Sequence, residues 1–218
     1  MKEPSKAEII NDTNRMVINF YEQLKNNYSG LESLVQSSLH SRAMHHDAFV
    51  MYSNPHLFSD LQLAWAFWIL TNQGFRAAIN NSWSSSNEGK KDTTKIASKK
   101  ALFCEDLKAR IETVQLECRD AIDVIKGRDR EDTFFYIDPP YYNSNMGHYG
   151  GYTLANFKEL LSLLSKLKGK FLLSSYPSDA LSEFTDLNGW HTKWFDMNIS
   201  ASAGNKRKIE VLTSNYPI

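Results

Sequence analysis

The sequence has no excess of either charge, only two cysteines and no long apolar run. Its 25 Lys and Arg residues balance 25 Asp and Glu residues. This argues against a strongly basic, indiscriminate nucleic-acid binder, although a local basic patch remains compatible with it. Cys104 and Cys118 have no metal-ligand spacing, so we expect two reduced, buried thiols and no metal site. Because no apolar run approaches the length of a membrane span and the charged amino terminus has no signal-peptide pattern, we expect a cytoplasmic protein that binds no membrane.

The length and composition are those of an ordinary globular chain. At 218 residues, it can bury a sizeable core, either as one large domain or as a core domain with a smaller inserted one. Hydrophobic residues make up 42% of the sequence and charged residues 23%. The function must therefore be sought in particular motifs.

One stretch combines a buried strand with a stiff turn. Residues 133–137 are mostly aromatic or β-branched and predict a short buried strand. Asp138-Pro139-Pro140-Tyr141 follows, and prolines can neither donate to a β-ladder nor continue a helix. We therefore expect the Asp138 carboxylate at the carboxyl end of a strand, where open α/β sheets bind ligands. This carboxylate and the Pro139 carbonyl can accept hydrogen bonds from an exocyclic amino group, beside the Tyr141 ring, on which a base can stack.

The segments after this motif extend the pattern. Residues 151–157 (Gly-Tyr-Thr-Leu-Ala-Asn-Phe) lead into an amphipathic helix, and residues 204–208 (Gly-Asn-Lys-Arg-Lys) precede a last strand that ends at Ser214-Asn215-Tyr216. In this order, the segments resemble the corresponding parts of the Dam-like DNA adenine methyltransferases. The resemblance runs from about Ala7 to the end of the sequence.

This resemblance implies an α/β fold, with a Rossmann-like sheet that binds S-adenosylmethionine and an inserted, mainly helical target-recognition region. It also implies transfer of a methyl group from S-adenosylmethionine to the exocyclic amino group of adenine in double-stranded DNA. The catalytic residues would be Asp138, Pro139, Pro140 and Tyr141. The target base would be flipped out of the duplex, and Tyr141 would stack on it.

Two acids are candidates for cofactor binding. Asp12 ends a predicted strand at residues 7–12, and an acid at that place in a Rossmann-like sheet accepts hydrogen bonds from ribose hydroxyls. Alternatively, Asp12 only caps the helix that begins near Thr13. Asp120 follows a predicted strand at residues 114–118, and the resemblance implies that it contacts the adenine ring of the cofactor. Glu117 and Asp123 are rivals for that role.

The sequence departs from the family before Ala7. Dam-like enzymes have a lysine-bearing segment, a first strand and a Gly-rich turn there, and none of these precedes Ala7. In the family sheet, the first strand lies centrally, between the second and the fourth, so its absence leaves an incomplete sheet with two unpaired edges. Unpaired buried backbone is costly. We therefore hypothesise that a second polypeptide supplies this strand and turn, or that they were lost by truncation or gene splitting.

The middle of the chain does not alternate strand and helix. We expect residues 1–38 and 113–218 to form the methyltransferase core, and residues 39–112 to be an inserted target-recognition region with an apolar helix at 57–70. Loop residues Arg76, Asn80 and Trp83 are candidates for base contacts. The candidates for phosphate contacts are Lys90, Lys91, Lys95, Lys99 and Lys100, with Lys206, Arg207 and Lys208 in a later basic loop. The alternative for each basic group is an ordinary solvated surface.

The remaining pattern completes an α/β core. Leu160, Leu161, Leu164 and Leu167 predict the buried face of a helix, followed by a strand at 170–175. Residues 190–195 and 209–215 predict a closing antiparallel pair.

Three other interpretations stay open. The first is a non-catalytic DNA-binding subunit or remnant of such an enzyme. The second is an RNA methyltransferase that acts on guanine, where similar Asp-Pro-Pro motifs occur. The third is a structural protein with an unrelated Asp-Pro-Pro turn, which leaves the flanking segments unexplained.

Overall fold

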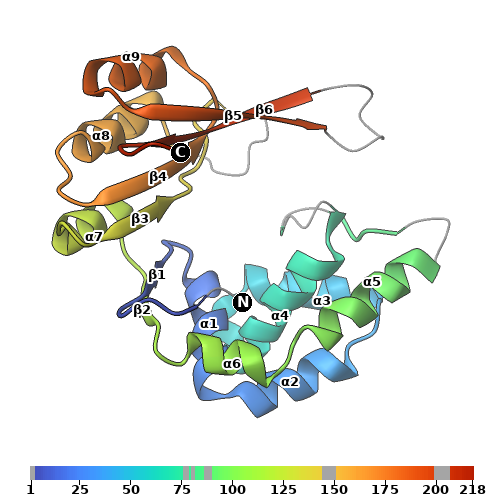
Figure 1. The fold of residues 1–218 in the computed structure, drawn as a ribbon. Helices are drawn as coiled ribbons and strands as arrows, with labels where there is room; N and C mark the ends of the chain where they lie inside the picture. The colour runs from blue at the N-terminus through green and yellow to red at the C-terminus, as the bar shows by residue number, and fades with distance from the viewer. Residues whose placement is uncertain (1–2, 76–78, 80–81, 86–89, 144–150, 199–206) are drawn as a thin grey trace. The chain divides into compact units, whose positions relative to one another are not determined.

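The computed structural model describes residues 3–75, 79, 82–85, 90–143, 151–198 and 207–218. It divides into two compact units, Met1–Ala121 and Ile122–Ile218. The elements of the first unit, shown in blue to green in Figure 1, are β1 (Ile9–Asn11), α1 (Arg15–Asn26), α2 (Tyr28–Ser37), α3 (Arg42–Ser53), the 3-10 helix η1 (Pro55–Leu57), α4 (Asp60–Gln73), α5 (Lys90–Ala101), α6 (Glu105–Ile111) and β2 (Gln115–Glu117). The later elements are α7 (Ala121–Arg128), β3 (Phe134–Ile137), α8 (Leu154–Leu164), β4 (Lys170–Ser175), α9 (Asp179–Asn188), β5 (His191–Asn198) and β6 (Arg207–Ser214).

The strands of the first unit form a parallel pair. β1 and β2 align with Ile10 opposite Leu116, and both lie within stretches that the sequence predicted as strands. Parallel pairing brings their carboxyl ends to one edge, so the residues that follow β1 and β2 lie close together.

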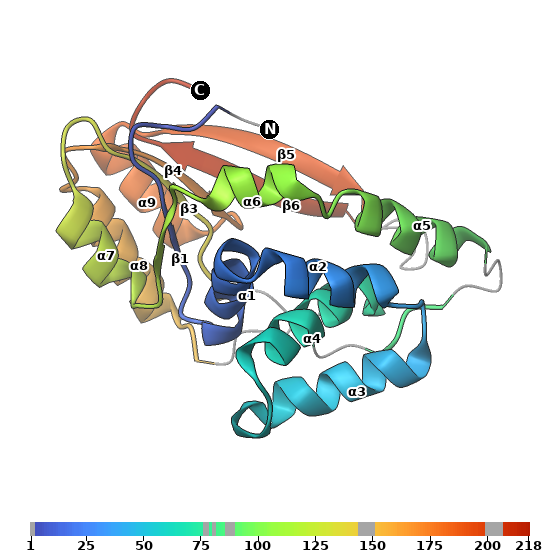
Figure 2. The same ribbon diagram turned by 90° about the horizontal axis from the view of Figure 1, so that it is seen from below.

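The helices of the first unit pack around α4. Its buried residues include Leu63, Ala66, Ile69 and Leu70, and α1, α2 and α3 contact it (Figure 2). The apolar helix predicted at 57–70 is therefore present, but it starts at Asp60. The Ser59 side chain accepts a hydrogen bond from the Gln62 amide, and the Gln62 side chain accepts one from the Ser59 amide. This capping box fixes the start of α4.

The second unit contains a four-stranded sheet in the order β3-β4-β6-β5. β3 and β4 are parallel, whereas β6 runs antiparallel to both β4 and β5. The predicted strand at 170–175 has those same bounds, and the predicted closing antiparallel pair is also confirmed.

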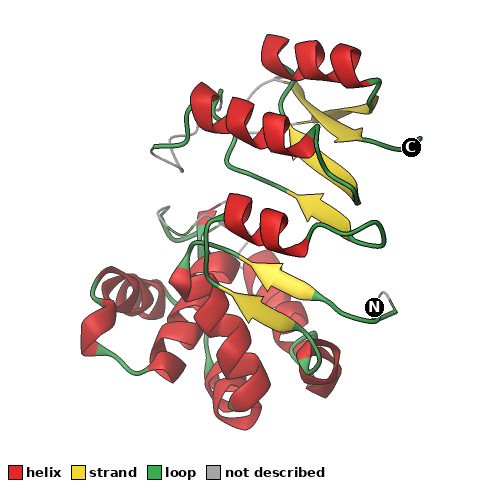
Figure 3. Ribbon diagram, turned by 90° about the vertical axis from the view of Figure 1, so that its left-hand side faces the viewer, coloured by secondary structure: helices red, strands yellow, loops and turns green. Residues whose placement is uncertain are grey.

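Helices cover one face of this sheet. Alternate strand residues point to the same face, and Phe171 and Leu173 of β4 are fully buried against helix residues such as Leu161 and Leu164 of α8. Figure 3 shows the helices of this unit on that one side of its strands. The helical spacing that predicted Leu160, Leu161 and Leu164 as a buried face is thus confirmed. Leu167, which was predicted on the same face, lies beyond the end of α8 and is half-buried.

Residues of β3 that point to the opposite face are exposed. Phe134 is 49% exposed and Tyr136 is 63% exposed, whereas Ile137 on the helix-covered face is 8% exposed. Among the described strands, β3 pairs only with β4 and β1 pairs only with β2.

One prediction about the cysteines is wrong. Cys118 is exposed, because it follows the last residue of β2 and lies in the turn beyond it, and Cys104 is half-buried just before α6. Both are free thiols.

None of the helices in the described parts of the chain is both long and apolar enough to span a bilayer.

Candidate active site and nucleic-acid interface

Asp138 lies where the sequence predicted it, directly after β3. Ile137 pairs with Leu173 of the parallel strand β4, so Asp138 and Ser174 lie at the same edge of the sheet. Asp138 is exposed, while Pro139 and Pro140 are half-buried. The carboxylate is therefore presented to solvent by a turn that the two prolines hold stiff.

A hydrogen-bonded network joins Asp138 to its neighbours. The Tyr141 hydroxyl donates to Asp138 Oδ1 at 3.1 Å and lies 2.6 Å from Ser174 Oγ. Burial raises the pKa of Tyr141 well above its usual value, so the phenol stays protonated at neutral pH and remains a donor. Asp138 Oδ2 accepts no hydrogen bond from the described residues. The network thus holds one carboxylate oxygen, Oδ1, in a hydrogen bond with Tyr141.

The end of β4 contributes residues that sequence reasoning missed. Ser174 is 7% exposed, and the ring of Tyr176 packs edge-on to Tyr141 with 4.5 Å between centroids. Asn143 Nδ2 donates to the carbonyl oxygen of Pro177 at 3.1 Å. The only signal in the sequence is a polar end to an apolar strand, and only the parallel pairing of β3 with β4 shows that this end adjoins Asp138.

The two predicted cofactor acids lie at one edge of the β1–β2 pair. Asn11 joins the two chain segments, because its side chain accepts from the Arg119 amide at 3.1 Å and donates to the Arg119 carbonyl at 3.0 Å. Asp12 follows Asn11 and is half-buried, whereas Asp120 follows Arg119 and is exposed. The structure therefore brings together two acids that are more than a hundred positions apart in the sequence.

Asp12 is not the cap of the following helix. Asn14 is the N-cap of α1, and its side chain accepts from the Met16 amide. Asp12 Oδ1 accepts from the Asn14 amide at 2.7 Å, so the carboxylate orders the turn before the cap. Asp12 Oδ2 has no hydrogen-bond donor among the described residues, and it can accept from a ribose hydroxyl.

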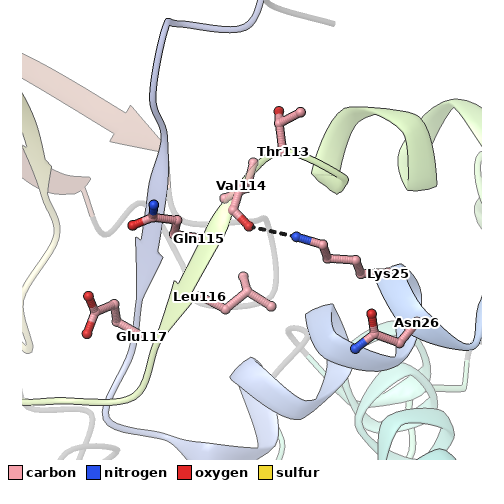
Figure 4. A pocket seen from close by; sticks show the side chains of 7 residues that line it. All are labelled: Lys25, Asn26, Thr113, Val114, Gln115, Leu116 and Glu117. Carbon is pink, nitrogen blue, oxygen red and sulfur yellow. Dashed lines mark hydrogen bonds between the residues drawn. The ribbon is translucent and has the colours of Figure 1, made fainter.

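A pocket of about 570 Å³ in the first unit is lined by neither Asp12 nor Asp120, although Glu117, the rival of Asp120, is one of its lining residues (Figure 4). It lies beside β2, and its lining residues are Lys25, Asn26, Thr113, Val114, Gln115, Leu116 and Glu117. Lys25 Nζ donates to the Val114 carbonyl at 3.2 Å, which ties the end of α1 to the segment that enters β2.

Several predicted nucleic-acid contacts lie outside the described residues. These are Arg76, Asn80 and Lys206. The described backbone places Lys90 and Lys91 in the first turn of α5, and Arg207 and Lys208 at the start of β6. Lys95 and Lys99 are exposed on α5. Lys100 is used within the first unit instead, because its Nζ donates to the Gln36 carbonyl at 2.6 Å.

Trp83 has packing partners that the sequence did not indicate. Its ring stacks on His40 with 4.7 Å between centroids, and the guanidinium carbon of Arg42 lies 4.9 Å from the ring centroid. The indole is half-buried. Its contact with a base therefore stays a prediction, whereas its contact with Arg42 is part of the fold.

Comparison with known proteins gives one family. The sequence model of the D12 class N6 adenine-specific DNA methyltransferases matches residues 1–198. No curated protein matches the sequence significantly. Because the family match covers most of the chain, the chain belongs to the D12 class N6 adenine-specific DNA methyltransferase family.

Proposed function

We propose that this chain provides the catalytic and DNA-binding surface for methylation of adenine N6 in double-stranded DNA, with S-adenosylmethionine as the methyl donor. Family membership supports DNA adenine methylation in general. The observation that carries the assignment of residues is the network of Asp138, Tyr141 and Ser174. It presents one open carboxylate oxygen beside an aromatic ring at the carboxyl edge of the sheet.

The amino group of adenine is a poor nucleophile, because its lone pair is delocalised into the ring. Hydrogen bonds from the two amino hydrogens to Asp138 Oδ2 and the Pro139 carbonyl favour a more tetrahedral nitrogen, whose lone pair can attack in line. Tyr141 offers its ring to the flipped base. Base–aromatic stacking is worth about 1–3 kcal/mol, which offsets part of the cost of extruding the base.

Asp12 and Asp120 fit the cofactor by the chemistry of their side chains. Asp12 Oδ2 is an open acceptor for a ribose hydroxyl, and Asp120 lies at the same strand edge, where the adenine ring would bind. S-adenosylmethionine, when bound, supplies an electrophilic methyl group on a sulfonium. In this proposal, Asp12 and Asp120 bind and orient the cofactor. Asp138 and Pro139, which belong to the second unit, prepare the amino group of adenine as the nucleophile.

Replacement of Asp138 tests this division of roles. We expect Asp138→Ala to lower turnover by at least about 100-fold, because the variant lacks the acceptor for the amino group. Duplex affinity should change little, since Asp138 contacts no phosphate in this proposal. Turnover is measured by transfer of labelled methyl groups, and affinity by fluorescence anisotropy.

Glu183→Ala is the matched control for Asp138→Ala, because Glu183 is an exposed acid on α9 of the same unit. Equal losses of turnover and duplex affinity in Asp138→Ala would contradict the assignment. Duplex binding without turnover by the complete wild-type assembly would favour a non-catalytic DNA-binding subunit. Preference for RNA would favour the guanine methyltransferase alternative.

We also propose that a second polypeptide supplies the strand and Gly-rich turn that complete the cofactor site. Two observations support this: β1 and β3 each pair with one neighbour among the described strands, and β3 exposes Phe134 and Tyr136. Strand edges with open backbone groups bind further strands.

Calorimetric titration with S-adenosylmethionine, with the mass in solution measured in parallel, tests the need for a partner. We expect the purified chain to show no tight binding by itself, and to gain it when the partner polypeptide is added. A monomeric, cooperatively folded chain that binds the cofactor tightly by itself would show that no second polypeptide is needed.

A further inference from the structure

The start of α3 is fixed against the end of α4. Gln73, the last residue of α4, is fully buried. Its Oε1 accepts from the Ser41 amide at 3.1 Å and its Nε2 donates to the Leu39 carbonyl at 2.8 Å. The segment 39–41 therefore has a defined backbone, and the two helices run side by side from this point (Figure 2).

A second segment closes over the same place. Gly74 and Trp83 form an antiparallel bridge, in which the Phe75 amide donates to the Ser82 carbonyl and the Ser84 amide donates to the Gln73 carbonyl, each at 2.8 Å. Trp83 is thus held at the base of the loop in which the sequence placed base-reading residues. Its ring packs on His40 and Arg42.

Arg42 is an exposed cation in an unusual place. It is the first residue of α3, and that helix has no acidic residue in its first turn. A positive charge at a helix N-terminus is unfavourable, because it opposes the positive end of the helix dipole. No described carboxylate forms an ion pair with Arg42. The contact with Trp83 offsets part of this cost, since a guanidinium on an indole face is attracted by about 0.5–2 kcal/mol.

Polar atoms beside Arg42 also have no partners. His40 Nδ1, His40 Nε2 and Trp83 Nε1 are buried and form no hydrogen bond with the described chain. Unpaired polar atoms cost stability, and the formal positive charge at this place is that of Arg42. An anion beside the exposed Arg42 guanidinium would supply the negative charge that no described carboxylate provides.

We propose that Arg42, stacked on Trp83 at the start of α3, binds a backbone phosphate of the duplex beside the bridge of Gly74 and Trp83. This inference rests on the proposed function, because it takes the nucleic acid as the source of the anion. A guanidinium held by an aromatic face is pre-organised for phosphate. The contact positions the loop on the duplex and reads no sequence itself.

The test measures duplex affinity by fluorescence anisotropy at a series of salt concentrations. Each phosphate contact contributes about 0.9 to the slope of log affinity against log salt concentration. We expect Arg42→Ala to reduce that slope by about 1 and to weaken binding by the same factor for duplexes of different sequence. Arg42→Lys should keep the slope, because it keeps the charge.

Arg130→Ala is the matched control, since Arg130 is an exposed arginine in the turn before β3, at the opposite end of that strand from Asp138. It should leave both slope and affinity unchanged. We expect Arg42→Ala to fold, because the Arg42 side chain is exposed. Circular dichroism checks this. Trp83→Leu, which removes the supporting ring, should weaken binding in the same direction.

Two results would overturn the assignment: a slope for Arg42→Ala equal to that of wild type, or a loss confined to one duplex sequence, which would make Arg42 a base contact. Absence of duplex binding by the complete wild-type assembly at every salt concentration would instead refute the proposed function itself.

Discussion

At the scale of single residues, Tyr141 combines a proposed role of its ring with an observed role of its hydroxyl. The sequence predicted its ring as a stacking face for a base. The structure adds that its hydroxyl bridges Asp138 and Ser174, which holds the ring and the carboxylate in one arrangement. Pre-organisation of this kind matters, because a catalytic group that is 1 Å out of place can cost about 100-fold in rate.

Ser174→Ala should therefore lower turnover by about tenfold, since the Tyr141 hydroxyl loses its contact with Ser174 Oγ. The free energy of unfolding should fall by about 0.5–1.5 kcal/mol, the usual worth of one hydrogen bond. Tyr141→Phe keeps the ring but removes the contacts of its hydroxyl with both Ser174 and Asp138. Turnover of the double variant should therefore be no lower than that of the less active single variant. Kinetics of the complete assembly and denaturant unfolding of the chain measure both effects.

Ser175→Ala provides the control for Ser174→Ala. Ser175 is the next residue along β4 and is 3% exposed, but its Oγ has no hydrogen-bond partner in the described part of the chain. Its replacement should be neutral in both assays. If the two serine variants behaved alike, the network would have no part in positioning Tyr141.

At the scale of elements, the entry to β4 depends on one glycine. The Gly169 amide donates to Asp129 Oδ1 at 3.0 Å, and its carbonyl accepts from Asn215 Nδ2 at 2.9 Å. A Cβ at this position would lie 2.6 Å from the Thr133 carbonyl oxygen and 2.7 Å from that of Arg130. Both are backbone atoms, so the segments that precede β3 and β4 can approach this closely only at glycine.

We expect Gly169→Ala to destabilise the second unit by about 1–3 kcal/mol, the range for overpacking a close contact. Gly127→Ala is the comparison, because no atom lies within 4 Å of a Cβ there. Gly127 lies in helix α7, so alanine should stabilise it by at most about 1 kcal/mol. Chemical unfolding measures both, and a neutral Gly169→Ala would contradict the close packing of these segments.

At the scale of the whole molecule, there are two hydrophobic cores, each made from one unit. The first includes Leu31 and Ile69 and the second includes Leu161 and Phe171, all of them fully buried. α2 and α4 thus build one core, and α8 and β4 build the other.

Leu31→Ala and Leu161→Ala should each cost about 2–5 kcal/mol, because each leaves a cavity among fully buried neighbours. Hydrogen exchange followed by mass spectrometry should show the loss of protection mainly in the unit that carries the substitution. Equal loss in α4 and α8 from either variant would show that the two cores unfold as one.

The sequence predicted elements with a strong local signal. The strand before Asp138, the strand at 170–175, the closing antiparallel pair and the α8 face all follow from side-chain periodicity, which is a local property. It did not predict α2, α3 or α9. Cys118 was expected to be buried and is exposed. The prediction failed because burial of a strand-end residue depends on what packs there and not on its own neighbours in sequence.

The sequence by itself determined the family and the carboxylate at a strand end, because each rests on a short run of residues in a fixed order. The cofactor role of Asp12 and Asp120 stays a prediction. Only the tertiary structure decided which other residues contact the predicted site residues and their neighbours. Ser174 reaches Tyr141, Asn11 joins Arg119, and Arg42 lies on Trp83. The physical reason is that these contacts depend on strand pairing and helix packing between segments far apart in the chain, which periodicity along one segment does not encode.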